Sequence, residues 1–350
     1  MGNKKTILVA PLNWGLGHAT RCIPIIQELI LNNFNVVIAS DGNALRLLQK
    51  EFPTLENITL PSYDISYPKN GSFLKWKLLL KLPHIKKAIA GEKKIIQKLV
   101  AEKKIQGIIS DNRFGVRNSK IPSVYLTHQI NVLSGNTTFL SSKIHQNIIH
   151  KFNECWVPDT KGDANLSGIL SQVTNSKIPI KYLGPLSRMK KENHTIKYDI
   201  LILLSGPEPQ RSILETILLK DFKDDSRNIL LIQGIVEKQQ KIFQFGNITS
   251  INYMLANDLQ DAINQSELVI CRAGYTTIMD LAILEKKVFF IPTPGQFEQE
   301  YLAQNLKEKN VAPFCNQEDF TKEKLKEVIN YSKLTINNTP VNYTNLFCLF

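Results

Sequence analysis

Short apolar runs alternate along the chain with stretches in which apolar residues recur every three or four positions. The runs predict buried strands and the periodic stretches predict helices. The first half reads as strands 6–10, 35–39, 58–60, 107–110, 123–126, 155–157 and 180–183, with helices 18–31, 43–51 and 85–100. The second half reads as strands 199–204, 228–233, 248–251, 268–271 and 288–291. One helix ends at residue 219, and further helices are predicted at 257–264, 276–284 and 322–331. Strands and helices that alternate in this way predict an α/β protein with doubly wound parallel sheets.

The pattern breaks once and then restarts. Residues 184–198 are polar and aperiodic, so they predict a linker between an N-terminal domain at 1–184 and a C-terminal domain at 199–332. A length of 350 residues with 43% hydrophobic and 21% charged residues suits two globular domains. The tail 333–350 has no clear pattern.

The segment from Glu267 to Tyr301 carries the most information. A strand leads through the turn Arg272–Gly274 into a helix, and a second strand follows, which makes one βαβ unit. Open parallel sheets bind ligands at the carboxyl ends of their strands, and a helix that starts there offers N–H groups to an anion. Asp280 lies six residues after Gly274, where its carboxylate could accept hydrogen bonds from ribose hydroxyls. The segment therefore predicts a nucleotide pocket.

This segment resembles the C-terminal domain of glycosyltransferase family 28, in a poorly characterised bacterial branch of the GT-B superfamily that includes the peptidoglycan N-acetylglucosaminyltransferase. The resemblance implies a GT-B fold: two Rossmann-like, doubly wound domains that face a central cleft. It implies that Arg272, Gly274, Thr276 and Asp280 bind the nucleotide. Asp280 stands where the family usually has Glu. Gln299 and Glu300 stand where a Gln-Gln pair contacts the donor sugar. It also implies that the tail crosses back to the N-terminal domain.

Gly15, Gly17 and His18 join the first strand to the first helix. Two glycines allow a tight turn that brings backbone N–H groups close to a ligand, and a neutral imidazole in the first turn of a helix can act as a base. The loop resembles the glycine loop that GT-B enzymes place toward the acceptor and the donor pyrophosphate. The alternative is that His18 only caps a loop.

The second half has a matching loop at Ser205 and Gly206, followed by Arg211. The resemblance implies that this loop cradles the donor phosphates; the alternative is an ordinary strand–helix connection. Asp111 and His128 each end or follow an apolar strand of the first half. They are candidate acceptor-site groups or a base-orienting pair, or else satisfied strand-end residues.

Charge is concentrated in one segment. Of the net charge of +12, residues 69–104 supply a surplus of nine, from eleven lysines and two glutamates. A local field of this kind argues against a general nucleic-acid binder. Residues 73–87 mix lysines with apolar side chains, which predicts either contact with an anionic membrane or a flap packed on the protein. Five widely spaced cysteines and the lack of a signal sequence predict a cytoplasmic protein, peripheral at the inner face of the membrane if its acceptor is a lipid.

We therefore expect a glycosyltransferase that moves a sugar from a nucleotide-diphosphate donor, uridine-linked, to the hydroxyl of a glycan or a lipid-linked acceptor. His18 would be the base, with Asp111 and His128 as further catalytic candidates. No cofactor and no metal is expected, because the chain has no Asp-x-Asp metal motif. Two alternatives stay open: a nucleotide-sugar hydrolase of the same fold, which would use water as the acceptor, and a non-catalytic nucleotide-sugar binder.

Overall fold

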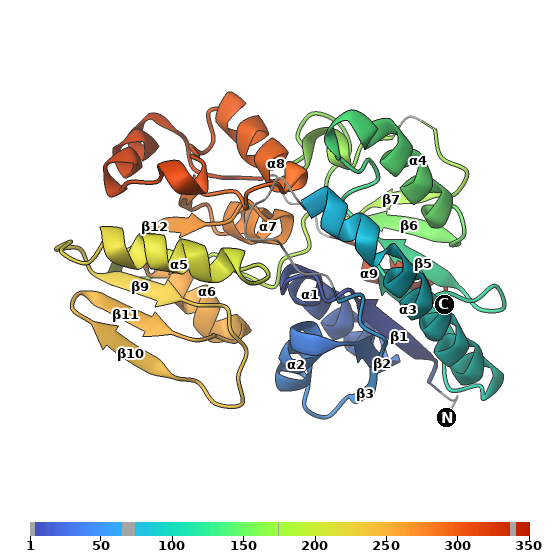
Figure 1. Cartoon of the computed structure of the whole chain (residues 1–350). Coiled ribbons are helices and arrows are strands. Elements are labelled where there is room, and N and C mark those ends of the chain that lie inside the picture. The colour runs from blue at the N-terminus through green and yellow to red at the C-terminus, as the bar shows by residue number, and fades with distance from the viewer. Residues whose placement is uncertain (1–3, 65–73, 174, 337–340) are drawn as a thin grey trace. The chain divides into compact units, whose positions relative to one another are not determined.

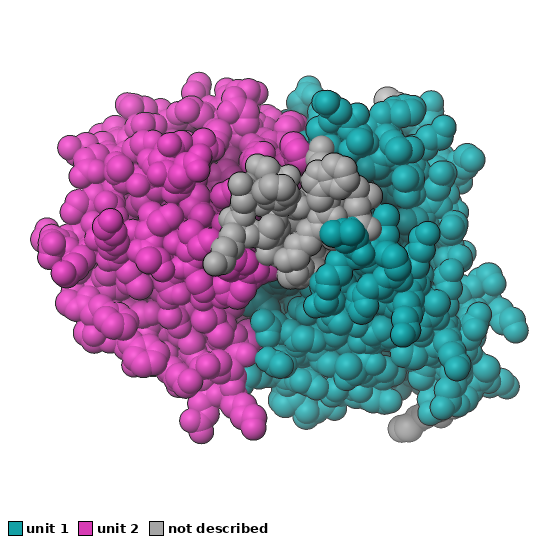
Figure 2. Space-filling model, in the orientation of Figure 1, with its two compact units in different colours: residues 1–65, 80–187, 337–350 teal, residues 66–79, 188–336 magenta. Residues whose placement is uncertain are grey.

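A computed structural model describes residues 4–64, 74–173, 175–336 and 341–350; the side chains of 74–79 are not described. The chain divides into two compact units (Figures 1 and 2). Unit 1 comprises residues 1–65, 80–187 and 337–350, and unit 2 comprises residues 66–79 and 188–336. Each unit is an α/β structure built on one sheet whose strands are mostly parallel, and the two units are described separately below.

Unit 1 is built on a seven-stranded parallel sheet in the order β3-β2-β1-β4-β5-β6-β7. Its strands are β1 (Thr6–Pro11), β2 (Asn35–Ser40), β3 (Glu56–Thr59), β4 (Gly107–Asp111), β5 (Ser123–Leu126), β6 (Glu154–Val157) and β7 (Ile180–Tyr182). Its helices are α1 (Gly17–Leu31), α2 (Gly42–Glu51), α3 (Leu74–Ala101, from residue 80 onward in this unit), α4 (Thr138–Ile149) and α9 (Tyr343–Phe347), with 3-10 turns at Gly135–Thr137 and Gly168–Leu170. The strand order reverses between β1 and β4, and ligands of open α/β sheets bind at such a point.

Unit 2 is built on a six-stranded sheet in the order β10-β11-β9-β8-β12-β13. Its strands are β8 (Tyr198–Leu203), β9 (Ile229–Ile232), β10 (Ile242–Phe245), β11 (Ile248–Ile251), β12 (Ser266–Cys271) and β13 (Lys287–Phe290). Its helices are α5 (Gln210–Asp221), α6 (Ala256–Asn264), α7 (Tyr275–Ile283) and α8 (Phe297–Glu308), followed by 3-10 turns at Gln317–Asp319 and Lys322–Asn330. All pairings are parallel except that of β10 with β11, and the order reverses between β8 and β12.

Apolar strands form the core of each unit. In unit 2, Ile202, Leu231, Ile270 and Phe289 come from four neighbouring strands and are fully buried. In unit 1, Leu8 and Ile108 pack against Ile96 on the inner face of α3. Continuous apolar strands of this kind suit parallel sheets that are covered on both faces.

The end of the chain packs in unit 1. The ring of Phe347 lies 6.2 Å from that of Trp156 and 5.9 Å from that of Phe34, and Phe350 lies 6.1 Å from Trp156. Aromatic contacts at these distances add stabilisation beyond the buried area. The aperiodic tail of the sequence is therefore fixed by a few aromatic side chains and not by an amphipathic helix.

Several elements differ from the sequence-based expectation. The helix α3 begins at Leu74 and continues through Pro83, whereas the pattern predicts a start at residue 85. The pattern does not predict α4, α8 or β10. The segment 322–330, predicted as part of an α-helix, is a 3-10 helix. Among the described residues, no helix combines the length and the apolar character needed to cross a membrane.

Candidate functional site

The loop from β1 to α1 borders open space. Gly15 has a φ of 79°, a left-handed conformation that favours glycine, and a Cβ built on it would meet no atom within 4 Å. The helix α1 starts two residues later, and its N-cap residue Leu16 gives no side-chain hydrogen bond to the first turn. The loop therefore presents the start of a helix, with its positive dipole end, and the N-cap residue itself supplies no side-chain cap.

Three predicted residues meet around one arginine at this loop. His18 Nδ1 lies 2.8 Å from Asp111 Oδ1, Arg21 Nε donates to Asp111 Oδ2 at 2.6 Å, and Arg21 Nη1 donates to His128 Nδ1 at 2.8 Å. Arg21, Asp111 and His128 are buried, whereas 14% of the His18 side chain is exposed. The structure thus brings His18, Asp111 and His128 together, although they come from three elements, α1, the end of β4 and the loop after β5.

The charge on Asp111 determines the tautomer of His18. Burial alone raises the pKa of Asp111, but the charge of Arg21 and hydrogen bonds from Arg21 and His18 outweigh it and hold that pKa at about 2. An ionised carboxylate can only accept, so the 2.8 Å contact requires a proton on His18 Nδ1. Arg21 Nη2 also lies 2.8 Å from His18 Nδ1, but a protonated nitrogen cannot accept a hydrogen bond. We therefore assign the hydrogen bond of Arg21 Nη2 to Asp111 Oδ1. Every described contact of the His18 ring runs through Nδ1, which leaves the Nε2 lone pair for a proton from a ligand.

His128 has a different environment. Arginine can only donate, so His128 Nδ1 accepts from Arg21 and the neutral ring carries its proton on Nε2. The side chain is 5% exposed. In this arrangement His128 helps to fix the guanidinium of Arg21 and is a weaker base candidate than His18.

A second buried arginine fixes the strand ends next to this cluster. Arg113 donates to the Pro11 carbonyl at 3.0 Å and to Glu92 Oε1 at 2.9 Å, and it also pairs with Asp41. Glu92 in turn accepts from Tyr63 Oη and from the Gly115 N–H, each at 2.9 Å. These bonds tie the ends of β1, β2 and β4 to α3, so the loop that carries His18 starts from a fixed backbone.

In unit 2 the predicted loops lie at one edge of the sheet. They follow β8, β12 and β13, which are neighbours, at the carboxyl ends of the strands. Gly206 has a φ of 97°, and a Cβ on it would meet no atom within 4 Å. Gly234, in the loop after β9, has a φ of 71° and a Cβ on it would lie 2.5 Å from the Leu204 carbonyl oxygen. Gly234 thus lets that loop support the one that holds Ser205 and Gly206.

The helix α7 is buried except along one stripe. Gly274, Thr277, Asp280 and Ile283 are partly exposed, while Tyr275, Thr276, Ile278 and Met279 between them are buried. A spacing of three places each of these residues next to the following one, so the exposed stripe winds round the helix from its N-terminus. Gly274 has an ordinary φ of −76°, and a Cβ on it would only touch Thr277 Oγ1 at 4.0 Å. Neither the backbone nor the neighbouring protein atoms require a glycine there, which is consistent with the close approach of a ligand.

Both predicted arginines of unit 2 are held by the protein itself. Arg272 is 1% exposed and donates to the carbonyls of Ile291, Pro292 and Gln210 at 2.8–3.0 Å. Arg211 is 6% exposed and pairs with Glu208 at 2.6 Å and with Glu215 at 2.7 Å. In this structure the guanidinium of Arg272 joins the loops after β8, β12 and β13.

Gln299 and Glu300 shape the loop after β13. Gln299 Oε1 accepts from the Thr293 N–H at 2.8 Å, and Glu300 Oε1 accepts from the Gly295 N–H at 2.9 Å. The amide nitrogen of Gln299 and the second carboxylate oxygen of Glu300 have no partner in the described part of the chain. One side of each group therefore holds the backbone, and the other can meet a sugar hydroxyl.

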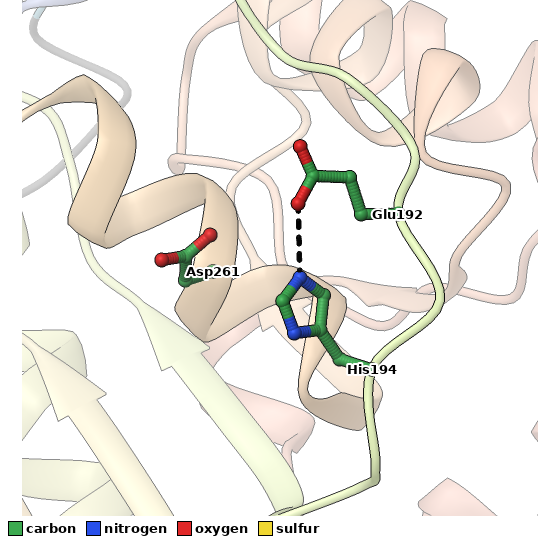
Figure 3. Close-up of side chains that lie close together, drawn as sticks. All are labelled: Glu192, His194 and Asp261. Atoms are coloured by element: carbon green, nitrogen blue, oxygen red, sulfur yellow. Dashed lines mark hydrogen bonds and ion pairs between the residues drawn. The ribbon is translucent and has the colours of Figure 1, made fainter.

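One group of side chains could hold a metal ion. The ligand atoms of Glu192, His194 and Asp261 lie within 4.8 Å of one another, and His194 Nε2 is 3.1 Å from Glu192 Oε2 (Figure 3). Asp261 lies near the end of α6, and this helix leads into the amino end of β12. The group is therefore at the opposite edge of the sheet from the loops above, so it has no place in chemistry at those loops.

The sequence analysis missed two residues of these clusters. Arg21 lies three residues after His18 on α1 and therefore on the same helix face, a spacing that could have suggested the pair. Thr277 shares a face with Asp280, whereas the predicted Thr276 is buried on another face.

Comparison with known proteins bears on the fold and on the type of reaction. Residues 200–343 match the glycosyltransferase family 28 C-terminal domain. The chain is a glycosyltransferase of the GT-B fold. It is 24% identical, over 324 residues, to the UDP-N-acetylglucosamine–N-acetylmuramyl-(pentapeptide) pyrophosphoryl-undecaprenol N-acetylglucosamine transferase of Haemophilus ducreyi, covering 89% of this chain and 86% of that protein.

Solved structures show the same fold at low identity. The glycotransferase of kitacinnamycin is 12% identical with a TM-score of 0.61, over 94% of this chain and 90% of that one. Acinetobacter baumannii MurG is 14% identical with a TM-score of 0.52, over 93% of this chain and 90% of that protein. The Haemophilus ducreyi protein and the kitacinnamycin protein are both named as transferases, so they give no support to the hydrolase alternative.

Proposed function

We propose that the chain transfers a sugar from a nucleotide-diphosphate sugar, uridine-linked, to an acceptor hydroxyl, with His18 as the general base. The contact between His18 Nδ1 and Asp111 Oδ1 at 2.8 Å carries this proposal. It leaves Nε2 available and supplies a buried carboxylate that stabilises the imidazolium when the ring takes up a proton.

In the proposed reaction, His18 Nε2 accepts the proton of the acceptor hydroxyl as its oxygen attacks the anomeric carbon of the donor. The bond between that carbon and the diphosphate oxygen breaks, and the nucleoside diphosphate leaves with the bonding electrons. Arg21 stays charged and, with Asp111, holds the ring in place. Asp111 and His128 are then positioning residues, and only His18 moves the proton.

Unit 2 would hold the donor at the edge formed by β8, β12 and β13. The loop at Ser205 and Gly206 and the start of α7 at Gly274 would offer backbone N–H groups to the diphosphate, where charge develops as it leaves. Asp280, on the exposed stripe of α7, would accept hydrogen bonds from the ribose. Gln299 and Glu300 would contact the sugar, while Arg272 would act by holding the three loops and Arg211 by fixing the start of α5.

A lipid-linked acceptor is the finer part of the proposal. The Haemophilus ducreyi relative is named for an undecaprenol-linked acceptor. Here Leu80 is 81% exposed and Leu82 is 45% exposed, beside Lys86 and Lys87 on α3. Exposed apolar side chains next to lysines suit the surface of an anionic membrane, which would place residues 73–87 beside the acceptor lipid. Residues 73–79 of that segment lie outside the residues whose side chains are described.

The test is turnover with defined substrates. A panel of nucleotide-diphosphate sugars is incubated with the protein, with and without undecaprenyl-diphosphate-linked sugar in detergent, and release of the nucleoside diphosphate is measured. We expect release from a uridine-linked donor that depends on the acceptor. Equal release without an acceptor would establish the hydrolase alternative, and donor binding without release would establish the non-catalytic binder.

A further inference from the structure

The outer edge of the six-stranded sheet is exposed and apolar. The strand β10 pairs with β11 alone among the described strands and ends the sheet (Figure 1). Ile242 is 63% exposed, Phe243 46% and Phe245 55%, and the rings of Phe243 and Phe245 stack with centroids 6.4 Å apart. Soluble proteins usually protect such an edge with charges, proline or a bulge, but residues 242–245 contain neither charge nor proline.

The backbone of β10 has unused hydrogen-bonding groups. The carbonyl of Lys241 accepts from the Asn252 N–H at 3.2 Å, and Phe243 lies opposite Ser250. Hydrogen bonding alternates along an antiparallel strand, so residues 241, 243 and 245 bond to β11. The N–H and C=O groups of Ile242 and Gln244 consequently point away from the sheet.

We propose that β10 is a homodimer interface, in which two copies of this chain pair their β10 strands antiparallel across a twofold axis at Phe243. A strand that meets its own copy antiparallel satisfies twofold symmetry, and this register pairs Ile242 with Gln244 of the second copy and Gln244 with Ile242. All four outward groups of each strand are then used. Phe243 meets Phe243 of the second copy on the axis, and Phe245 faces Lys241, an aromatic–cation pair.

The apolar area is sufficient for a small interface. Each exposed phenylalanine can bury on the order of 100 Å², about half of a fully buried aromatic side chain. Three apolar side chains and the strand backbone from two copies therefore reach roughly 1,000 Å², the lower end of specific interfaces. We expect a dimer that dissociates at about micromolar concentrations. The net charge of +12 opposes association, so added salt should strengthen the dimer.

A matched pair of variants tests the backbone pairing. Gln244→Pro removes an outward N–H group but no bond to β11, whereas Gln244→Ala removes the same side chain and keeps the N–H. In sedimentation velocity from about 1 to 100 µM, the wild type and Gln244→Ala should dimerise, and the dissociation constant of Gln244→Pro should rise tenfold or more. Circular dichroism should be the same for all three.

Crosslinking tests the register. In a Cys348→Ser background, which removes the exposed cysteine, Phe243→Cys should form a disulfide-linked dimer under mild oxidation, because a symmetric register brings the two Cα atoms to about 4.5 Å. Phe245→Cys should not, because its two copies lie about 14 Å apart. A wild type that stays monomeric at 100 µM would overturn the proposal, and a strand of another protein would then be the remaining candidate to pair with β10. A dimer that Gln244→Pro does not weaken and Phe243→Cys does not crosslink would also overturn it.

Discussion

The two units share one architectural plan but present different groups at the corresponding edge of the sheet. In unit 1 the edge at the strand reversal carries ionisable side chains, His18, Asp111 and Arg21, in mutual contact. In unit 2 the corresponding edge presents backbone, an uncapped helix start at Gly274 and the left-handed Gly206, while Arg272 is turned into the protein. Proton transfer needs a side chain with a suitable proton affinity, whereas a phosphate is held well by N–H groups at a helix start. Under the proposed function, proton transfer belongs to unit 1 and donor binding to unit 2.

The largest expected effect is on His18. If His18 is the base, His18→Ala should lower kcat about 10²–10⁴-fold and leave nucleotide affinity within twofold, because the base acts only in the chemical step. Asp111→Asn should also lower kcat, since a neutral amide does not stabilise the protonated imidazole as the ionised carboxylate does. Steady-state kinetics and calorimetry on the same preparations would check this, with His194→Ala in unit 2 as the control. A His18→Ala enzyme within a few-fold of wild type would move the base elsewhere.

The next effect concerns acid stability, which should differ between the units. In unit 1, burial lowers the pKa of His145 to about 4, and its Nε2 contacts Tyr125 Oη at 2.8 Å. An unfolded histidine titrates near 6.5, so the unfolded state takes up a proton first as the pH falls. The stabilisation is complete above about pH 6.5 and is lost progressively down to about pH 4, by about 3 kcal/mol.

Urea unfolding from pH 4 to 7, followed by tryptophan fluorescence, would measure this loss, because Trp156 is buried in unit 1. A His145→Gln variant should show a flatter dependence on pH, and His84→Gln, at an exposed position of α3 in unit 1, serves as the control. An unchanged profile in His145→Gln would mean that another group controls acid unfolding.

A smaller effect is expected for the nucleotide subsite. Loss of a charge-assisted contact worth about 1.5–3 kcal/mol should weaken nucleoside-diphosphate binding by Asp280→Ala tenfold or more. The kcat at saturating donor should change little if the ribose contact is equally strong in the ground state and in the transition state. Glu267→Ala removes an exposed carboxylate at the amino end of β12 and should leave binding unchanged. Equal affinity of Asp280→Ala and wild type in calorimetry would exclude Asp280 from the site.

The smallest effect is expected for the surface of α3. Each lysine near an anionic leaflet adds at most about 1 kcal/mol. Lys86→Glu/Lys87→Glu should therefore reduce flotation with anionic liposomes, while Lys93→Glu/Lys94→Glu, further along α3 and also exposed, should have less effect. High salt should release the wild type. Absence of flotation at low salt would favour a soluble acceptor or the hydrolase alternative.

Much of the fold follows from local pattern. Except for β10, the strands of both sheets were predictable because most of them are short apolar runs between polar loops, and β12–α7–β13 has a glycine turn as well. The helix α4 was not predictable in this way, because Phe139 and Leu140 on it are 80% and 58% exposed, and a helix with apolar residues on its outer face gives no clear amphipathic signal. The strand β10 is exposed at every residue and gives no alternation.

By itself the sequence determined that the chain has two α/β halves, that glycine loops follow the first strand of each, that His18 and Asp111 lie at a helix start and a strand end, and that Asp280 follows the turn at Gly274 by six residues. These features depend on residues close together in the chain. Only the tertiary structure decided that His18, Arg21, Asp111 and His128 form one network and that Arg272 faces inward. Such contacts join residues up to 107 positions apart, and the direction of a side chain depends on the elements packed around it, which no local pattern records.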